Sequence, residues 1–378
     1  MQRPRIVYLV TEDWYFMSHR LPMACAARNA GYDVHVITRV SKHAAAIRAE
    51  GFTLHPLNLD RGNQNPFHVG SAILQVRRIY KQLRPQIIHH VALLPTVVGS
   101  IASLGLPLWK INAVTGFGFV FTSRSWKARL FRPVMAWVLR RLLGRTKSVV
   151  LVQNPDDRDM IRALGVEPAN IVLIPGSGVD TNAMQPMPEP AGPVTAAFVG
   201  RLLEDKGIRP LVDAIALLSA RGAPVQLLIA GTTDPTNPAS IPDRDVAAWR
   251  QRPGISMLGH VNDITGVWAR AHIAVLPSRR EGLPKSLLEA AACGRPIVAT
   301  DVPGCREIAR PSLNALLVPV DDTNALADAI GQLAADPALR SRFGNASRQL
   351  AVTEFSSDRI GKDIVALYDR VTTGATAT

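Results

Sequence analysis

Acidic residues are missing from a long stretch of this chain. No Asp or Glu lies between Asp60 and Asp156, whereas 14 Lys or Arg residues do. Residues 1–150 hold 21 basic and 5 acidic residues, a balance of +16, and residues 151–378 hold 22 and 25, a balance of −3. This one-sided charge predicts that the first half meets nucleic acid, a phospholipid surface or a phosphorylated substrate. A basic face that is merely solvated is the alternative.

Cysteine and long apolar runs are also scarce. Cys25, Cys293 and Cys305 form no CxxC pair and no metal-ligand cluster, so we expect a reduced cytoplasmic protein with incidental thiols. We expect no secretory signal before the first strand, "RIVYLV". The most apolar stretch, residues 85–109, has no charged residue, but prolines, glycines and histidines break it. It therefore predicts strand, helix and strand rather than a membrane span.

Several well-known motifs are absent too. The sequence has no GxGxxG and no GxxxxGK[ST], so neither a dinucleotide fingerprint nor a P-loop is supported. It has no helix-turn-helix, zinc-finger or RNA-recognition signature, which weakens the nucleic-acid alternative.

Short β-rich runs alternate with helix-length segments in both halves, which is typical of parallel, helix-covered sheets. The sequence predicts an α/β protein with two doubly wound, Rossmann-like domains and a cleft between them, where ligands meet the carboxyl ends of the strands. We expect an N-terminal domain over 1–183, a Pro-rich linker over 184–193 and a C-terminal domain over 194–355. Residues 356–378 are expected to form a final helix that can cross back to the N-terminal domain, and a frayed tail.

The segment "FVGRLLEDKG" (198–207) joins a strand to a helix expected to begin near Pro210. Arg201 and Lys206 lie in this connection, where cations and a helix N-terminus suit a diphosphate. The alternative is a local ion pair with Glu204 or Asp205.

A second strand-to-helix connection carries two acids, Glu281 and Glu289, around the proline-started helix of "EGLPKSLLEA". We expect Pro284 at the first helical position. Carboxylates accept hydrogen bonds from vicinal hydroxyls, so acids beside a phosphate site predict sugar binding. Alternatively, Glu281 caps the helix and Glu289 is a surface residue.

These segments resemble a known family. The run "EGLPKSLLEAAACGRPIVATDVPGCREI" (281–308) resembles the E-x7-E signature of retaining glycosyltransferase family 4, which has the GT-B fold, and "GRLLEDKGI" resembles its GR-x4-KG loop. The resemblance implies a nucleotide-diphosphate-sugar donor, Arg201 and Lys206 on the diphosphate, Glu289 on the ribose and Glu281 on the transferred sugar. It implies catalysis by Glu281, Arg201 and Lys206, with no metal and no cofactor. It further implies donor contacts from Gly259, His260, Val261, Gly282, Leu283, Pro284 and Lys285.

The N-terminal half resembles a bacterial subgroup that elongates polyprenyl-diphosphate-linked saccharides for surface polysaccharides and glycans. Ser18, His19 and Arg20 stand at the expected entrance of the first helix, an anion-friendly place. Where many family members carry a His, this chain has Thr115, followed by Gly116. His90 can reach the cleft instead, although a lone His at a strand end is more often a packing residue. The predicted acceptor-binding residues are Ser18, His19, Arg20, His90, Thr115 and Gly116.

The stretch "RSWKARLFRPVMAWVLRRLLGRTK" (124–147) combines basic and aromatic residues at helical spacing. A helical wheel places Trp126, Leu130, Val134, Trp137 and Val138 on one arc and Arg129, Arg132 and Arg140 opposite. An interfacial helix needs this combination, so we predict membrane contact. A core helix with a solvated basic edge is the alternative. The predicted membrane-facing residues are Trp126, Lys127, Arg129, Arg132, Trp137, Arg140 and Arg141.

The resemblance therefore implies a retaining hexosyltransferase, and we expect it at the cytoplasmic face of the inner membrane. It would move a hexose or N-acetylhexosamine, most simply from a UDP-sugar, to a polyprenyl-diphosphate-linked saccharide, with no nucleic-acid partner. A nucleotide-sugar epimerase of GT-B fold and a basic nucleic-acid-binding protein are the alternatives.

Overall fold

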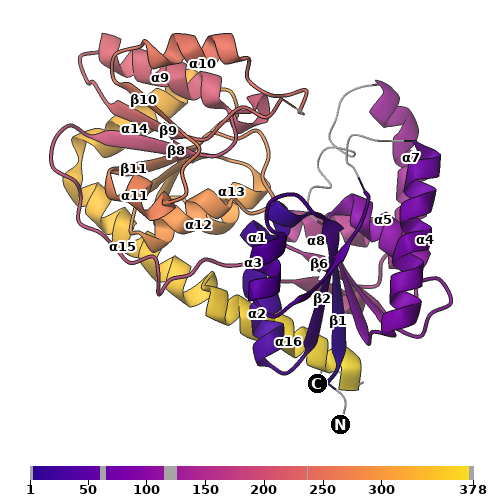
Figure 1. Cartoon of the computed structure of the whole chain (residues 1–378). Helices are drawn as coiled ribbons and strands as arrows, with labels where there is room; N and C mark the ends of the chain where they lie inside the picture. Colours follow the sequence, from indigo (N-terminus) through magenta and orange to yellow (C-terminus); the bar gives the residue numbers. More distant parts are fainter. Residues whose placement is uncertain (1–2, 60–64, 115–125, 236, 374–378) are drawn as a thin grey trace. The chain divides into compact units, whose positions relative to one another are not determined.

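The computed structural model describes residues 3–59, 65–114, 126–235 and 237–373, with the backbone only for 126–131 (Figure 1). It divides into two units, Met1–Ser177 with Ser357–Thr378, and Gly178–Ser356. The second unit begins before the expected boundary at residue 183, because the amide of Val179 donates to the Phe355 carbonyl at 2.8 Å. The expected linker also lies in this unit, where Glu189 pairs with Arg340 at 2.7 Å.

Within the described residues, unit 1 contains a parallel sheet of order β3-β2-β1-β4-β5-β6-β7. Its strands are β1 (Arg5–Glu12), β2 (Asp33–Arg39), β3 (Thr53–Pro56), β4 (Ile87–Val91), β5 (Trp109–Ala113), β6 (Ser148–Val152) and β7 (Ile171–Leu173). Its helices are α1 (Asp13–His19), α2 (Leu21–Asn29), α3 (Ala44–Ala49), α4 (Pro66–Leu83), α5 (Leu93–Ala102), α7 (Trp126–Leu143), α8 (Pro155–Ala163) and α16 (Ser357–Thr373), with a 3-10 turn at Pro168–Asn170.

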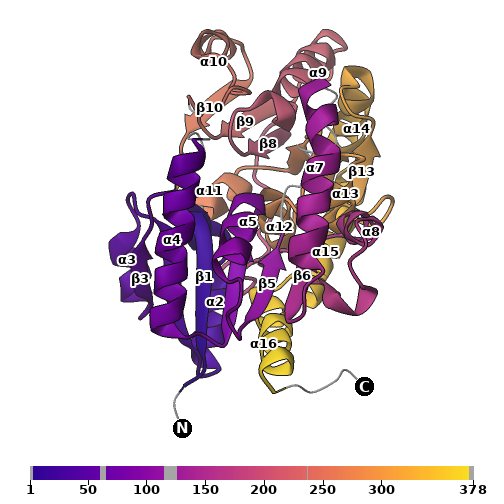
Figure 2. The ribbon, with the colours of Figure 1, turned by 90° about the vertical axis from the view of Figure 1, so that its right-hand side faces the viewer.

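Alternation along β1 explains how both faces of this sheet are covered. Ile6, Tyr8 and Val10 pack into one buried cluster with α2 and α16, whereas Val7 and Leu9 pack into another with α4 and α5. Figure 2 shows α4, α5 and α7 side by side on one face of the sheet. The expected strand, helix and strand over 85–109 are confirmed as β4, α5 and β5.

Unit 2 contains a second parallel sheet, of order β10-β9-β8-β11-β12-β13 in the part of the chain that is described. Its strands are β8 (Thr195–Val199), β9 (Gln226–Ala230), β10 (Ile255–Gly259), β11 (Ile273–Leu276), β12 (Ile297–Thr300) and β13 (Ala315–Val318). Its helices are α9 (Ile208–Ala220), α10 (Asp243–Arg250), α11 (Ile264–Ala269), α12 (Lys285–Ala292), α13 (Pro303–Ile308), α14 (Thr323–Ala335) and α15 (Pro337–Glu354), with a 3-10 turn at Glu204–Lys206. The predicted doubly wound architecture is confirmed in both units.

The strand order of each sheet fixes where a ligand can bind. The chain reverses direction across the sheet between β1 and β4 in unit 1, and between β8 and β11 in unit 2. In open α/β sheets, ligands bind beyond the carboxyl ends of the strands at this switch point. The connections after β8 and β11 carry Arg201, Lys206 and Glu281.

Candidate functional site in unit 2

The connection that follows β8 packs closely against the residues that follow β11. Gly207 caps α9 in a left-handed conformation, with φ of 69°. A Cβ at this position would lie 1.9 Å from the carbonyl oxygen of Pro277, so only glycine fits. This close approach places Lys206, the preceding residue, beside the connection that follows β11.

Lys206 and Glu281 meet across this junction. The Lys206 ammonium lies 2.5 Å from Glu281 Oε1, which also accepts a hydrogen bond from the Ser278 hydroxyl at 2.6 Å. The side chains of Lys206 and Glu281 are 23% and 9% exposed. The alternative of a local ion pair for Lys206 is not what the structure shows. Nor does Glu281 cap α12, whose N-terminus has no side-chain cap.

Arg201 is the more open of the two cations. Its side chain is 48% exposed and donates to Asp234 Oδ2 at 2.9 Å, a residue that follows β9. A guanidinium carries five N–H donors, so this contact leaves most of them for a ligand.

Helix α12 positions the second acid. Pro284 is the N-cap of α12 rather than its first residue, because its backbone is extended, with ψ of 112°. Its carbonyl accepts a hydrogen bond from the amide of Leu288. Glu289 is 7% exposed, so it is not the surface residue of the alternative. Burial raises the pKa of the Glu289 carboxyl above its ordinary 4.5, and Lys285, 3.5 Å away, opposes that shift.

The predicted donor contacts Gly259, His260 and Val261 lie at the carboxyl end of β10, the edge strand of the same sheet. Gly259 ends β10, and its carbonyl accepts from the amide of Gly231 at 2.7 Å. His260 is exposed and Val261 is half-buried. Gly231 also approaches Gly200 closely, so the connections after β8, β9 and β10 share one edge of unit 2.

Two residues that contact the predicted site residues were not identified in the sequence analysis. Ser278 and Asp234 hold Glu281 and Arg201 in place but belong to neither motif. The position of Ser278 three residues before Glu281, at a strand end, was the available clue.

Residues predicted to bind an acceptor

Ser18, His19 and Arg20 lie where two helices of unit 1 meet. The helix expected after the first strand is α2, and Arg20 is its N-cap, as the prediction requires; Ser18 and His19, however, end the additional short helix α1. The Ser18 hydroxyl lies 2.5 Å from His19 Nδ1, and the His19 ring stacks on Tyr15. Arg20 is only 1% exposed. Helix α1 begins at Asp13 directly after β1, and the sequence analysis did not predict it.

His90 is a packing residue. Its side chain is fully buried, with Nδ1 2.7 Å from Asn112 Oδ1 and Nε2 3.2 Å from the Tyr80 hydroxyl. Burial lowers its pKa to about 4. A Cβ at Gly99 would overlap the His90 ring, so the ring occupies a slot made by a glycine. The predicted acceptor contact of His90 is therefore wrong, and Thr115 and Gly116 lie outside the described residues.

Helix α7 exposes aromatic and basic side chains together. Trp137 and Val134 are each 59% exposed, and Arg141 lies over the Trp137 ring at 5.3 Å. Leu139, in contrast, packs into the core with other apolar residues of the helix. Of the predicted basic arc, Arg132 is half-buried and Arg140 is exposed. The side chains of Trp126, Lys127 and Arg129 lie outside the described residues.

Comparison with known proteins

No helix in the described residues combines the length and apolar character needed to cross a bilayer. Likewise, no three His, Cys, Asp or Glu side chains gather in the described part of the chain so as to hold a metal ion.

Two family models match the chain, one for each sheet. Residues 5–153 match the glycosyl transferase 4-like model, and residues 193–336 match the model of glycosyl transferases group 1. The capsular polysaccharide biosynthesis glycosyltransferase CapM of Staphylococcus aureus is 22% identical over 98% of both chains. The N,N'-diacetylbacillosaminyl-diphospho-undecaprenol alpha-1,3-N-acetylgalactosaminyltransferase of Campylobacter jejuni is 24% identical over 94% of this chain and 98% of its own.

Solved structures agree on the fold. Sucrose-phosphate synthase from Thermosynechococcus elongatus matches with a TM-score of 0.83 and 22% identity over 99% of this chain and 100% of its own. Anabaena Alr3699/HepE in complex with UDP-glucose matches with a TM-score of 0.76 and 17% identity over 97% and 99% of the two chains.

Two doubly wound parallel sheets with paired motifs after β8 and β11 thus define a glycosyltransferase of GT-B fold. The chain belongs to the GT-B glycosyltransferases that carry the group 1 and 4-like domains.

Proposed function

We propose that this enzyme is a retaining glycosyltransferase that transfers a hexose or N-acetylhexosamine from a UDP-sugar to a polyprenyl-diphosphate-linked saccharide. The observation that carries the proposal is the contact between Lys206 and Glu281, which joins the two motifs at the switch point of unit 2. The solved complex of HepE with UDP-glucose supports the choice of donor, and the Campylobacter transferase named for a diphospho-undecaprenol substrate supports the acceptor class.

The chemistry of this edge suits a nucleoside diphosphate as leaving group. When the sugar–phosphate bond breaks, negative charge develops on the β-phosphate, and Arg201, Lys206 and the amino end of α12 would stabilise it. We propose that these cations take the role that a metal ion has in other transferases. Activity that persists in excess EDTA is the expected result, and activity restored only by a divalent cation would contradict it.

Glu281 would orient the transferred sugar, and Glu289 the ribose. The carboxylate of Glu281 is already held by two donors, so it accepts hydrogen bonds from hydroxyls without large rearrangement. For a retaining reaction, the acceptor hydroxyl would attack from the side of the leaving group, with a phosphate oxygen receiving its proton. We propose that unit 1 binds the acceptor.

A donor screen tests the proposal first. Purified protein is melted with UDP-, GDP- and ADP-sugars, and a UDP-sugar should raise the melting temperature of the wild type more than that of Arg201→Ala. Arg221→Ala is the matched control, because Arg221 follows the far end of α9 in an exposed pair with Asp328. The labelled donor is then offered with a polyprenyl-diphosphate-linked saccharide, and NMR of the product should show that the anomeric configuration of the donor is kept. Conversion of the donor without acceptor would indicate an epimerase, and an inverted product would contradict retention.

We also propose that unit 1 docks on an anionic membrane through α7. Exposed Trp137 and Val134 supply apolar contact, and Arg140 and Arg141 supply charge, in a region whose sequence has no acid from residue 61 to 155. Wild type should sediment with vesicles that contain phosphatidylglycerol and not with pure phosphatidylcholine. Trp137→Ser should weaken this binding, and unchanged binding would exclude α7 as the docking surface.

A further inference from the structure

A basic pocket lies at the edge of the unit 1 sheet opposite to the carboxyl ends of its strands. Lys110 is the second residue of β5, and Arg145, Thr146 and Lys147 directly precede β6. The pocket has a volume of about 360 Å³. Because GT-B donor and acceptor sites form at the carboxyl ends of strands, this pocket belongs to neither.

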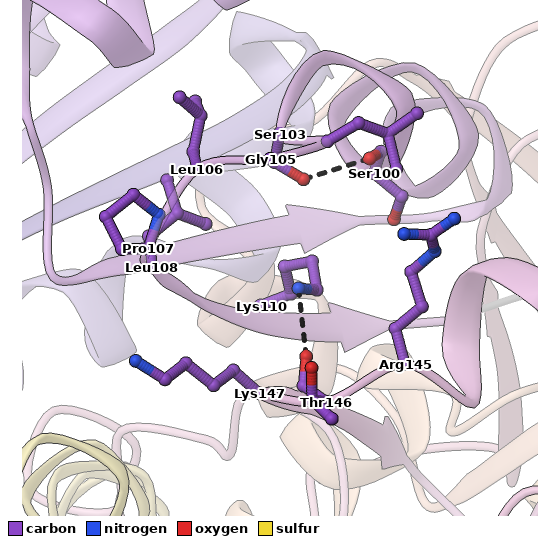
Figure 3. Close-up of a pocket in the computed structure, with 11 residues that line it drawn as sticks. Ser100, Ser103, Gly105, Leu106, Pro107, Leu108, Lys110, Arg145, Thr146 and Lys147 are labelled. Atoms are coloured by element: carbon purple, nitrogen blue, oxygen red, sulfur yellow. Dashed lines mark hydrogen bonds between the residues drawn. The ribbon is translucent and has the colours of Figure 1, made fainter.

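Three cations line the pocket with no acid among the residues that form it. Figure 3 draws Lys110 in the middle, with Arg145 beside Ser100 on one side and the Lys147 side chain extending away on the other. No ion pair in the described residues joins any of the three to a carboxylate, and the sequence from 61 to 155 offers none nearby along the chain. Arg145 and Lys147 are exposed, whereas Lys110 is only 8% exposed.

Lys110 is the residue of this pocket that most favours an anionic ligand. Its ammonium donates one hydrogen bond, to the Thr146 carbonyl at 3.2 Å, although it has three donors. Burial, followed by repulsion from Arg145 and Lys147, lowers the pKa of Lys110. A buried charge is costly unless it is paired, so an anion bound here would satisfy Lys110 and relieve the repulsion at once.

The walls of the pocket define the class of anion. Residues 104–108 contribute leucines and a proline to the lining, and the remaining lining residues contribute cations and hydroxyls. A volume of this size is at the lower end of the roughly 300–1,000 Å³ typical of ligand pockets, which leaves room for more than an inorganic ion. Arginine and lysine together are the usual partners of phosphate oxygens.

We propose that this pocket binds a phosphate group that carries a small organic substituent, held by Lys110, Arg145 and Lys147. The phosphate comes either from a free phosphate ester or from the headgroup of an anionic lipid, and the two sources share this chemistry. The site is separate from the sugar-transfer machinery, so it would hold its ligand whether or not the enzyme turns over.

Calorimetric titration tests the proposal with inorganic phosphate and glycerol 3-phosphate at constant ionic strength. The titrations use the Arg201→Ala background, because the donor site also attracts phosphate. Adding Arg145→Ala and Lys147→Asn should weaken binding about 10-fold to 100-fold, less than two buried charge-assisted hydrogen bonds would give, because both side chains are exposed. Asn tolerates the left-handed backbone at position 147, where φ is 55°. Lys110→Met, which keeps the apolar stem, should have a similar effect.

A charge-matched control separates site binding from general electrostatics. Arg48→Ala with Arg78→Ala removes the same charge from exposed helical positions of unit 1 outside the pocket, and should leave phosphate affinity unchanged. Equal affinity in the pocket variants and the parent, or equal losses in pocket and control variants, would overturn the proposal.

Vesicle binding then distinguishes the two sources. If the pocket variants, but not the controls, lose binding to phosphatidylglycerol vesicles, the ligand is a lipid headgroup. If vesicle binding is unchanged while glycerol 3-phosphate binding is lost, the ligand is a free phosphate ester. Both outcomes support the phosphate site.

Discussion

Replacing Lys206 by alanine separates what the Lys206–Glu281 contact does for stability from what it does for catalysis. The variant leaves a carboxylate that is 9% exposed, with the Ser278 hydroxyl as its remaining hydrogen-bond donor among the described residues. Removing one partner of a fully buried ion pair costs about 3–5 kcal/mol. Because the Lys206 side chain is 23% exposed, water can enter the vacated space. We therefore expect a loss of about 2 kcal/mol, below the fully buried range.

This loss is large enough to measure. For a domain of about 150–250 residues, 1 kcal/mol shifts the melting temperature by about 2–4 °C, so the transition of unit 2 should fall by about 4–8 °C. Turnover should fall about 100-fold to 1,000-fold, as when one donor to a developing oxyanion is removed. Calorimetric melting and steady-state kinetics with the identified donor and acceptor measure the two effects on one preparation.

The double variant Lys206→Ala/Glu281→Gln isolates the pair. A neutral amide no longer needs the ammonium, so the added cost of Lys206→Ala in the Glu281→Gln background should drop to about 0.5 kcal/mol or less. Turnover should not recover, because the diphosphate still lacks its cation. A wild-type melting temperature in Lys206→Ala, or turnover restored in the double variant, would refute the reasoning. Arg221→Ala, an exposed pair on the same unit, should change stability by no more than about 0.5 kcal/mol.

Three further predictions follow from the same edge of unit 2. Arg201→Ala should lower turnover about 100-fold while changing stability by less than about 1 kcal/mol, since its side chain is 48% exposed, and a large fall in melting temperature would contradict this. Glu289→Gln should be more stable than wild type at neutral pH and equally stable below about pH 4. The reason is that the pKa of the Glu289 carboxyl is raised in the folded protein, so ionisation of this group removes stability as the pH rises. The variant should also have a higher KM for the donor, and parallel urea titrations across pH test the sign of the stability change. Gly304→Ala should cost about 1–3 kcal/mol, because its Cβ would lie 2.4 Å and 2.6 Å from the carbonyl oxygens of Gly282 and Glu281; an unchanged melting temperature would show that this turn yields easily.

Local sequence patterns were sufficient to predict the strands and the two motifs. Short, mostly apolar runs mark buried strands, and each of the six strands that form the unit 2 sheet in the described structure has this form. Arg201 and Glu281 were recognisable because each follows such a strand at a fixed spacing. Each of these residues lies within about ten positions of its own strand, and so short a separation along the chain also limits the separation in space.

Contacts between distant segments could not be predicted in the same way. Lys206 and Glu281 are 75 residues apart, and their pairing depends on β8 lying next to β11 and on the tight approach that Gly207 allows. His90 failed as a ligand because the alternation of β4 turns its ring toward Gly99, and one position along a strand exchanges the two faces. The sequence pattern of α7 did not show which of its apolar residues face the core: Leu139 packs on the sheet, whereas Trp137 remains exposed.

The positions of the cations in the structure help to explain the charge asymmetry of the sequence. Like charges without acids between them repel one another and destabilise a folded unit, so a stretch with 14 cations and no acid is costly unless anions neutralise it. The structure places some of these cations beside exposed Trp137 on α7, and others around buried Lys110. A cation that only keeps a protein soluble has no reason to be buried, since burial removes the water that stabilises it. Lys110 therefore argues against the solvated basic face, and for a phosphate-bearing partner of unit 1.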